Sequence, residues 1–192
     1  MTRDHVAPTL LVFGLFAFGV LLVVAGYRDR FEDVTHRSQI SPELADRVLR
    51  IHQAASDRTP SDTAARAIAS DAPTSFVEIA AYRILFEIAP TRTAGVILAE
   101  GSFQRGSDRV RGWEDTADVV FGARSNTLTD AELALYCHWV VSGQEGWSPD
   151  EMMLTRQQLL TRLLSRHVID RSTYETMSAQ PLVLRPTPIP IY

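Results

Sequence analysis

The stretch Leu128-Thr-Asp-Ala-Glu-Leu-Ala-Leu135 decides the fold class, because it contains a helix start followed directly by an apolar run. Its first part is a capping box: the Thr129 hydroxyl accepts a backbone amide of the first turn, and the glutamate reaches back to the amide of the cap. The same pattern returns at Ser148-Pro-Asp-Glu151. We therefore predict a helix that carries the apolar run to Val141 and a second helix that ends near Arg166.

Helical signals also fill the first half of the chain. Ser41-Pro-Glu43 combines a hydroxyl cap, a proline at the first helical position and an acid in the first turn. A set of apolar residues then falls on one face at helical spacing: Leu44, Val48, Ile51 and Ala55. Further short helices are expected in this half over residues 61–69, 76–88 and 93–103.

Strand signals are weak throughout. Residues 104–112 indicate a polar, glycine-bounded loop, and no stretch alternates apolar and polar residues over a convincing length. Asp170 is expected to cap a last helix, and the prolines at its far side favour an extended tail over residues 183–192. The predicted fold class is therefore all-α.

The composition limits the function classes that need attention. A chain of 192 residues has room for one anchor and one compact domain. Its formal net charge of −4 offers no basic footprint for nucleic acid. No cofactor motif is present, and the acidic run Asp29–Asp33 has no metal-ligand spacing. Cys137 is the only cysteine, and we expect a small buried residue, with a catalytic thiol as the less favoured interpretation.

A charge-free stretch, Val6–Tyr27, lies near the amino terminus. A helix that crosses a bilayer needs roughly 20 predominantly apolar residues. We therefore predict a cytoplasmic stub and transmembrane anchor over residues 1–27, followed by a juxtamembrane linker over 28–40. The alternative is a cleaved secretory signal, but the apolar run exceeds the roughly 7–15 residues usual for such a signal. The flanking charges leave the orientation open.

Several motifs of the second half follow one another in a fixed order. They are Phe121-Gly122, the stretch from Leu128 to Leu135, Trp147-Ser-Pro149, Arg156, Leu159-Leu-Thr-Arg-Leu163, Val168-Ile-Asp170, Tyr174 and Pro181-Leu182. In this order and spacing the chain resembles the C-terminal part of the peptidoglycan glycosyltransferase domain, family 51, of class A penicillin-binding proteins. The resemblance implies a lysozyme-like helical glycosyltransferase lobe over residues 41–182. It also implies a single-pass protein of the bacterial cytoplasmic membrane, with the domain on the periplasmic side. In that family a transpeptidase domain follows; this sequence ends there, so none is expected.

Enzymes of this family need a carboxylate to deprotonate the acceptor hydroxyl, and the resemblance places a different residue there. When the family motif is laid on Pro42, His52 takes the position of the glutamate and Gln53 that of the neighbouring aspartate. Imidazole titrates near neutrality, so His52 is a candidate base. The simpler interpretation, which we favour, is a partly exposed helix histidine. The next family motif, which builds a mobile flap over the lipid substrate, has no counterpart here.

The second carboxylate position of the family falls on Ile79, with Phe76 at the lysine of that motif. Glu78 lies one residue away, which is about 100° of rotation on a helix. Glu78 and Glu87 are expected to be solvated helix charges, and Glu132 to serve its capping box. No catalytic, cofactor-binding or metal-binding residue is therefore assigned.

These motifs lead to one favoured function and two alternatives. The favoured hypothesis is a membrane-anchored, catalytically inactive relative of the family with an interaction or regulatory role in peptidoglycan synthesis. Besides the lipid bilayer, its partner would be a penicillin-binding protein, another cell-wall or membrane protein, or peptidoglycan. The first alternative is an active minimal glycosyltransferase that polymerises the lipid-linked disaccharide precursor with displaced residues such as His52 and Glu78. The second is a remnant without a function of its own. We also expect the C-terminal helices to form the stable core and residues 57–74 its weakest part.

Overall fold

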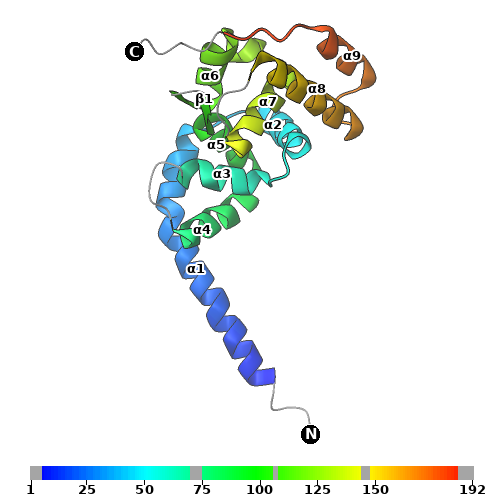
Figure 1. The fold of residues 1–192 in the computed structure, drawn as a ribbon. Coiled ribbons are helices and arrows are strands. Elements are labelled where there is room, and N and C mark those ends of the chain that lie inside the picture. Colours follow the sequence, from blue (N-terminus) through cyan, green and yellow to red (C-terminus); the bar gives the residue numbers. More distant parts are fainter. Residues whose placement is uncertain (1–5, 70–74, 106–107, 144–147, 186–192) are drawn as a thin grey trace.

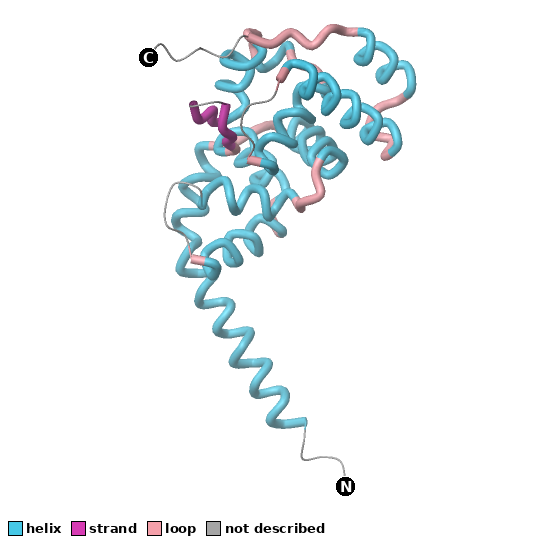
Figure 2. Tube along the Cα trace, in the orientation of Figure 1, coloured by secondary structure: helices cyan, strands magenta, loops and turns pink. Residues whose placement is uncertain are grey.

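A computed structural model describes residues 6–69, 75–105, 108–143 and 148–185, and of residues 6–17, 20, 21, 23 and 149 it gives the backbone alone. Within these ranges most of the chain is helical, so the predicted all-α class is confirmed (Figures 1 and 2). The long first helix, α1 (Val6–Arg37), projects its amino-terminal half from a body that the other helices form (Figure 1).

The carboxyl-terminal part of α1 belongs to the body. Tyr27 and Phe31 pack their rings against Tyr82 and Phe86, with centroids 5.7 and 4.9 Å apart. The helix continues to Arg37, so residues 28–37 of the predicted linker over 28–40 are helical. Among the side chains that the structure describes, no helix is long and apolar enough to cross a membrane. Most of the expected anchor lies outside that described set.

The next helices begin where the sequence signals place them. α2 (Pro42–Ala55) starts at Ser41, whose hydroxyl accepts the Leu44 amide at 3.2 Å. It is followed by α3 (Pro60–Ala69), α4 (Phe76–Glu87) and α5 (Pro90–Glu100). The expected helix over 93–103 therefore begins earlier and ends earlier, because proline suits the first turn of a helix.

The helix α3 is buried far more deeply than its small side chains suggest. Ala64 and Ala65 are fully buried, and α3 packs against both α4 and α5. Small residues let helix backbones approach closely. The contact is therefore densely packed, although each residue buries little surface area. The burial of residues 60–69 opposes the expectation that 57–74 is the weakest region, while 70–74 lie outside the described residues. Hydrogen exchange remains the measurement that decides it.

A short antiparallel hairpin stands where a loop was predicted over 104–112. Strand β1 (Ser102–Arg105) pairs with β2 (Asp108–Arg111), and Phe103 lies opposite Val110 with both side chains buried. That loop prediction was wrong in residues 104–105 and 108–111. Each strand has only four residues, so the alternation is too short to stand out in the sequence.

The second half of the chain completes the body. α6 (Gly112–Thr116) runs into a π-helical turn, η1 (Ala117–Phe121), and a short 3-10 turn, η2 (Ser125–Thr127). Then come α7 (Asp130–Ser142), α8 (Pro149–Ser165) and α9 (Arg171–Ala179). Both predicted capping boxes are present, and Asp170 caps α9 as expected.

Helix α7 lies in the centre of the hydrophobic core. The Tyr136 hydroxyl donates to the Ile97 carbonyl at 2.6 Å, and the Trp139 ring stacks at 5.8 Å on Phe121. The inner face of α8 adds buried leucines, whereas no described residue of α9 is fully buried. The expected C-terminal core is thus built mainly by α7 and half of α8.

The extended segment after α9 returns to the hairpin and η1. The buried guanidinium of Arg105 donates to the Val119 carbonyl at 2.6 Å and to the Arg185 carbonyl. The Arg185 amide donates to the Val120 carbonyl at 2.8 Å, and its side chain pairs with Asp118 at 3.2 Å. These bonds fix the segment across the end of the body.

Candidate functional site

A cavity of about 680 Å³ lies beside the turn that joins α1 to α2. We call it the cleft. The turn residues 38–40 form one wall, α5 contributes Gly95 and Leu98, and α6 contributes Trp113 and Glu114. The remaining described lining residues come from α1, α2, α5, the η2 turn and α7, and they are Arg37, Leu44, Arg47, Ala99, Ser125, Asn126 and Leu133.

The wall made by the turn is held against α5 by the absence of a side chain at Gly95. A Cβ at that position would lie 1.9 Å from the Ser38 carbonyl oxygen, a backbone atom. Any side chain there would force the turn away from α5 and reshape the cleft. Ser38 itself is buried, and its hydroxyl donates to the Val34 carbonyl at 2.9 Å.

Some polar groups of the cleft already have hydrogen-bond partners. Arg47 donates to an Asp130 carboxylate oxygen at 2.6 Å, and the Ser125 hydroxyl donates to Glu114 at 2.6 Å. Trp113 packs against the buried Tyr136 ring with centroids 5.2 Å apart. The cleft therefore offers guanidinium groups, one carboxylate among its described lining residues and an aromatic wall.

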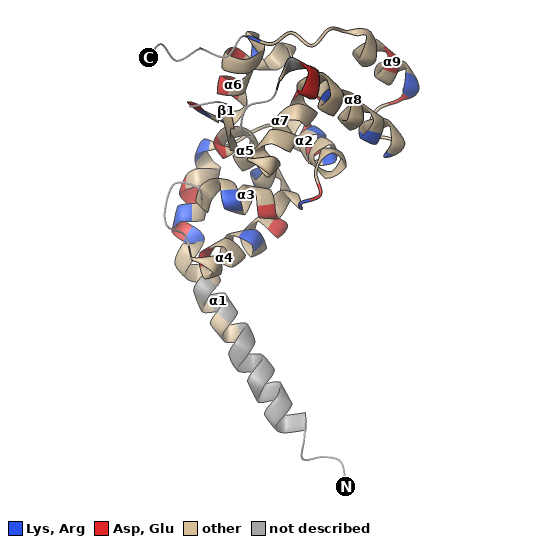
Figure 3. Ribbon diagram, viewed as in Figure 1, with Lys and Arg blue, Asp and Glu red and all other residues tan. Residues whose placement is uncertain are grey.

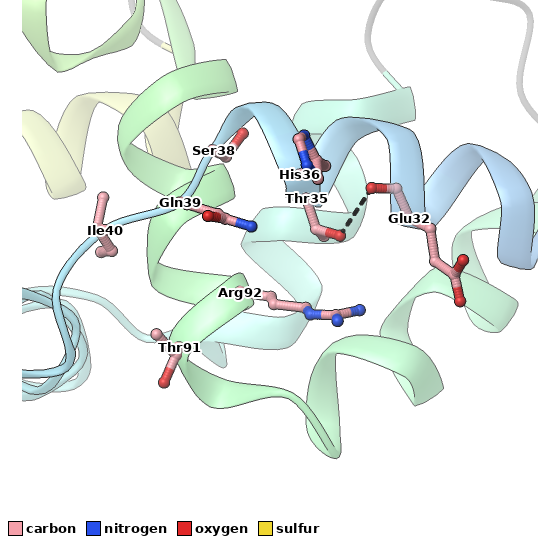
Figure 4. A pocket seen from close by; sticks show the side chains of 8 residues that line it. All are labelled: Glu32, Thr35, His36, Ser38, Gln39, Ile40, Thr91 and Arg92. Carbon is pink, nitrogen blue, oxygen red and sulfur yellow. Dashed lines mark hydrogen bonds between the residues drawn. The ribbon is translucent and has the colours of Figure 1, made fainter.

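A second cavity, of about 310 Å³, lies on the same turn and shares residues 38–40 with the cleft. Figure 4 shows Gln39 and Arg92 extending into it, with Thr35 donating to the Glu32 carbonyl at 3.2 Å. The Arg92 guanidinium lies 5.8 Å from the centroid of the Phe31 ring. A hydrogen bond from Arg28 lowers the pKa of the Glu32 carboxyl. This cavity is a small polar recess beside the α1–α2 turn.

His52 lies outside both cavities and is completely buried. Its Nε2 is 3.0 Å from the Thr63 hydroxyl oxygen, and that hydroxyl donates to the Thr59 carbonyl at 3.2 Å. Nε2 is therefore the donor, and Nδ1 has no hydrogen-bond partner. Burial lowers the pKa of His52 to about 4. The prediction of a partly exposed histidine was wrong, since the ring belongs to the contact between α2 and α3.

The acidic candidates of α4 are also held in packing contacts. The Glu78 side chain is only 13 % exposed and accepts from Arg30 of α1 at 2.9 Å. Glu87 accepts from the Ser61 hydroxyl of α3 at 2.6 Å. The expectation of a solvated charge is therefore wrong for Glu78, whereas Glu87 is exposed and bonded. The neighbouring Ile79 is half-buried and packs on the core.

Glu132 serves the capping box as predicted, since it accepts the Thr129 amide at 2.9 Å. It also lies 3.8 Å from the buried Arg156 guanidinium. Arg156 donates to the Met177 carbonyl at 2.8 Å and the Gln180 carbonyl at 3.2 Å. This cluster holds α7, α8 and the end of α9 together.

Two further candidates have structural positions. Cys137 is fully buried, as expected, and burial raises the pKa of its thiol to about 12. The Gln53 side chain is exposed, and its backbone carbonyl accepts a hydrogen bond from the Arg166 guanidinium. Among the described residues, no group of three His, Cys, Asp or Glu side chains is placed to hold a metal ion.

The side chains considered for catalysis do not gather at one place. His52 belongs to the α2–α3 contact, Glu78 to the α1–α4 contact and Glu132 to the α7–α8 contact. Trp113 and Glu114, which do line the cleft, were not singled out from the sequence. They follow Gly112 in a polar stretch, and no motif marks them there.

Comparison with protein families and with curated proteins found no relative of this chain. No family model matches the chain, and no curated protein matches it either. The glycosyltransferase resemblance therefore stays a prediction that rests on the order of motifs in the second half.

Proposed function

We propose that this protein is a membrane-anchored, catalytically inactive relative of the family 51 glycosyltransferases that acts by binding a partner in bacterial cell-wall synthesis. One observation carries the proposal: the side chains at and beside the family's catalytic positions are used to hold the fold together. Glu78 neutralises Arg30 between two helices, and His52 is neutral and closed to solvent.

Glycosyl transfer of this kind requires acid–base groups within hydrogen-bond reach of the reacting hydroxyl and leaving group. The cleft has one carboxylate among its described lining residues, Glu114, which a hydroxyl already occupies. A single carboxylate cannot both deprotonate an acceptor and assist a departing diphosphate in one arrangement. The same groups suit binding, because guanidinium, amide and indole surfaces contact sugars and peptides.

The anchor and the outer location are part of this proposal. They are supported by the charge-free stretch Val6–Tyr27, whose backbone is helical throughout, and by the family topology. A reporter active only in the periplasm, fused after Tyr192, tests both. Activity of a cytoplasm-only reporter at that position would contradict the orientation.

A polymerisation assay with the lipid-linked disaccharide precursor tests the absence of catalysis. We expect a rate at least about 10²-fold below that of an intact family member, since the loss of one positioned acid–base group alone typically costs 10²–10⁴-fold. Glycan chains formed at an ordinary rate would contradict the proposal. If that rate fell in Glu114→Gln and stayed in Glu87→Gln, the protein would be the minimal active enzyme instead.

Co-sedimentation with purified peptidoglycan tests the binding role of the cleft. Asn126 is exposed on its rim, so Asn126→Trp should fill the cleft and abolish binding. Gln158→Trp places the same ring at an exposed site of α8 and should leave binding intact. Equal binding by both variants would remove the cleft from the proposal, and no binding by the natural protein would direct the search to protein partners.

A further inference from the structure

Helix α4 exposes an apolar surface that no described part of the chain covers. Phe76 is 85 % exposed, Ile88 77 %, Val77 51 % and Ile84 44 %. Val77, Ile84 and Ile88 lie on one side of the helix, because each residue turns it by about 100°. We call Val77, Ile84 and Ile88 the α4 face, and Phe76 lies about 100° round the helix from Val77. Exposed apolar clusters of this kind on a folded protein usually mark a contact surface.

The position of α4 in the fold indicates what the α4 face can contact. The buried side of α4 packs on α3, α5 and α1, so the α4 face points away from the body. Figure 1 shows α4 as the element of the body nearest to the free half of α1. The opposite end of the body carries α8 and α9.

The level of α4 along α1 is fixed by two ring contacts. Tyr27, the last residue of the charge-free stretch, contacts Tyr82, and Phe31 contacts Phe86. A helix rises about 1.5 Å per residue, so these contacts span roughly 6 Å of the α1 axis. Because Tyr82 contacts Tyr27, the middle of α4 lies at the level at which the charge-free stretch ends.

We propose that the α4 face lies in the surface of the lipid bilayer from which α1 emerges, as a second membrane contact of the domain. This inference rests on the proposed anchor. Interfacial helices bury an apolar face about 5–10 Å into the boundary between headgroups and acyl chains. α4 meets that requirement with its apolar face. Where α1 passes α4 it carries charges of both signs (Figure 3), and Arg28 pairs with Glu32 and Arg30 with Glu78.

Lipid fits this face better than a protein partner does. The charge-free stretch ends at Tyr27, which contacts Tyr82 of α4, and this leaves no room for a folded domain between the α4 face and the bilayer. Phe18 and Leu22 of α1 are also exposed, by 61 % and 59 %, on the side of that helix away from Tyr27. A water-exposed α4 face would have to stand beside the bilayer without touching it.

Fluorescent labels on the full-length protein test the contact. Ile84→Cys, Phe18→Cys and Leu154→Cys would each be labelled with an environment-sensitive dye and placed in phosphatidylethanolamine–phosphatidylglycerol vesicles. Leu154 is 61 % exposed on α8 and is the control away from α4. The natural protein serves as the labelling blank, because Cys137 is buried. Nitroxide-bearing headgroup lipids then report contact by quenching.

We expect the label at 84 to emit at shorter wavelength and to be quenched at least about twofold more than the label at 154. Quenching at 18 without quenching at 84 would overturn the inference and leave the anchor standing. Quenching at neither position would overturn both. A short-wavelength emission at 84 that nitroxide lipids do not quench would assign the face to protein contact and overturn the lipid contact.

Discussion

The buried His52 should make the protein sensitive to mild acid. Its Nε2 donates to Thr63, its Nδ1 has no partner, and burial lowers the pKa from the ordinary 6.5 to about 4. The unfolded chain therefore takes up this proton before the folded protein does. The contribution to stability is fully present above pH 6.5 and is lost progressively as the pH falls toward 4.

The size of this effect follows from the two pKa values. A difference of one pKa unit corresponds to roughly 1.4 kcal/mol, so the interval from 6.5 to about 4 corresponds to about 3 kcal/mol. A small domain is stabilised by about 5–15 kcal/mol in total. Protonation of His52 alone should therefore remove a large part of the free energy of unfolding by pH 4.

Urea unfolding in detergent micelles at pH 7, 6, 5 and 4.5 measures this loss. The glutamine of His52→Gln cannot take up a proton. The free energy of unfolding of this variant should therefore fall less as the pH is lowered, even if it is smaller at pH 7. Burial and Arg162 also lower the pKa of His138, so that residue contributes in the same direction to both proteins. If the free energy of unfolding fell equally with pH in the natural protein and in His52→Gln, the reasoning would be refuted. His36→Gln is the control at an exposed histidine, and its free energy of unfolding should fall with pH as that of the natural protein does.

Two backbone positions give further predictions. Gly95→Ala should lower the free energy of unfolding by about 2 kcal/mol, because overpacking against the Ser38 carbonyl costs up to about 3 kcal/mol and better helix propensity returns about 1. Gly26→Ala is the matched control, since a Cβ there meets nothing within 4 Å, and it should not destabilise; equal urea midpoints for both variants would contradict the close approach. His167 has a left-handed φ of 57° just after α8, so His167→Gly should raise stability by about 0.5–1 kcal/mol in the same measurement. Ser165→Gly, inside the last turn of α8, should lower stability instead, and a gain there would contradict the assignment.

Local chemistry explains why the helix starts could be predicted. The caps at Ser41, Thr129, Ser148 and Asp170 depend on a side chain and amides within the first turn, and all are present. The hairpin was missed because its only buried pair is Phe103 and Val110.

The candidate site depended on long-range packing, which local patterns do not contain. His52 lies between Val48 and Ala55 on the buried side of α2, so helical spacing held a signal for its burial. The partner of Glu78 is 48 positions away in α1, and no pattern links the two. The cleft is lined by residues of five helices and of the turns between them. Its walls are positioned by long-range contacts such as that of Gly95 with Ser38.

The bonds of Arg105 set an order of events during synthesis. Its guanidinium is buried, and one of its acceptors, the Arg185 carbonyl, is 80 positions later in the chain. A buried donor without an acceptor costs about 1–3 kcal/mol. While the ribosome is still making the segment beyond α9, Arg105 therefore lacks one of its two acceptors, and the hairpin end of the nascent domain is less stable by about that amount. The arrival of Arg185 supplies the missing acceptor and favours closure of this end.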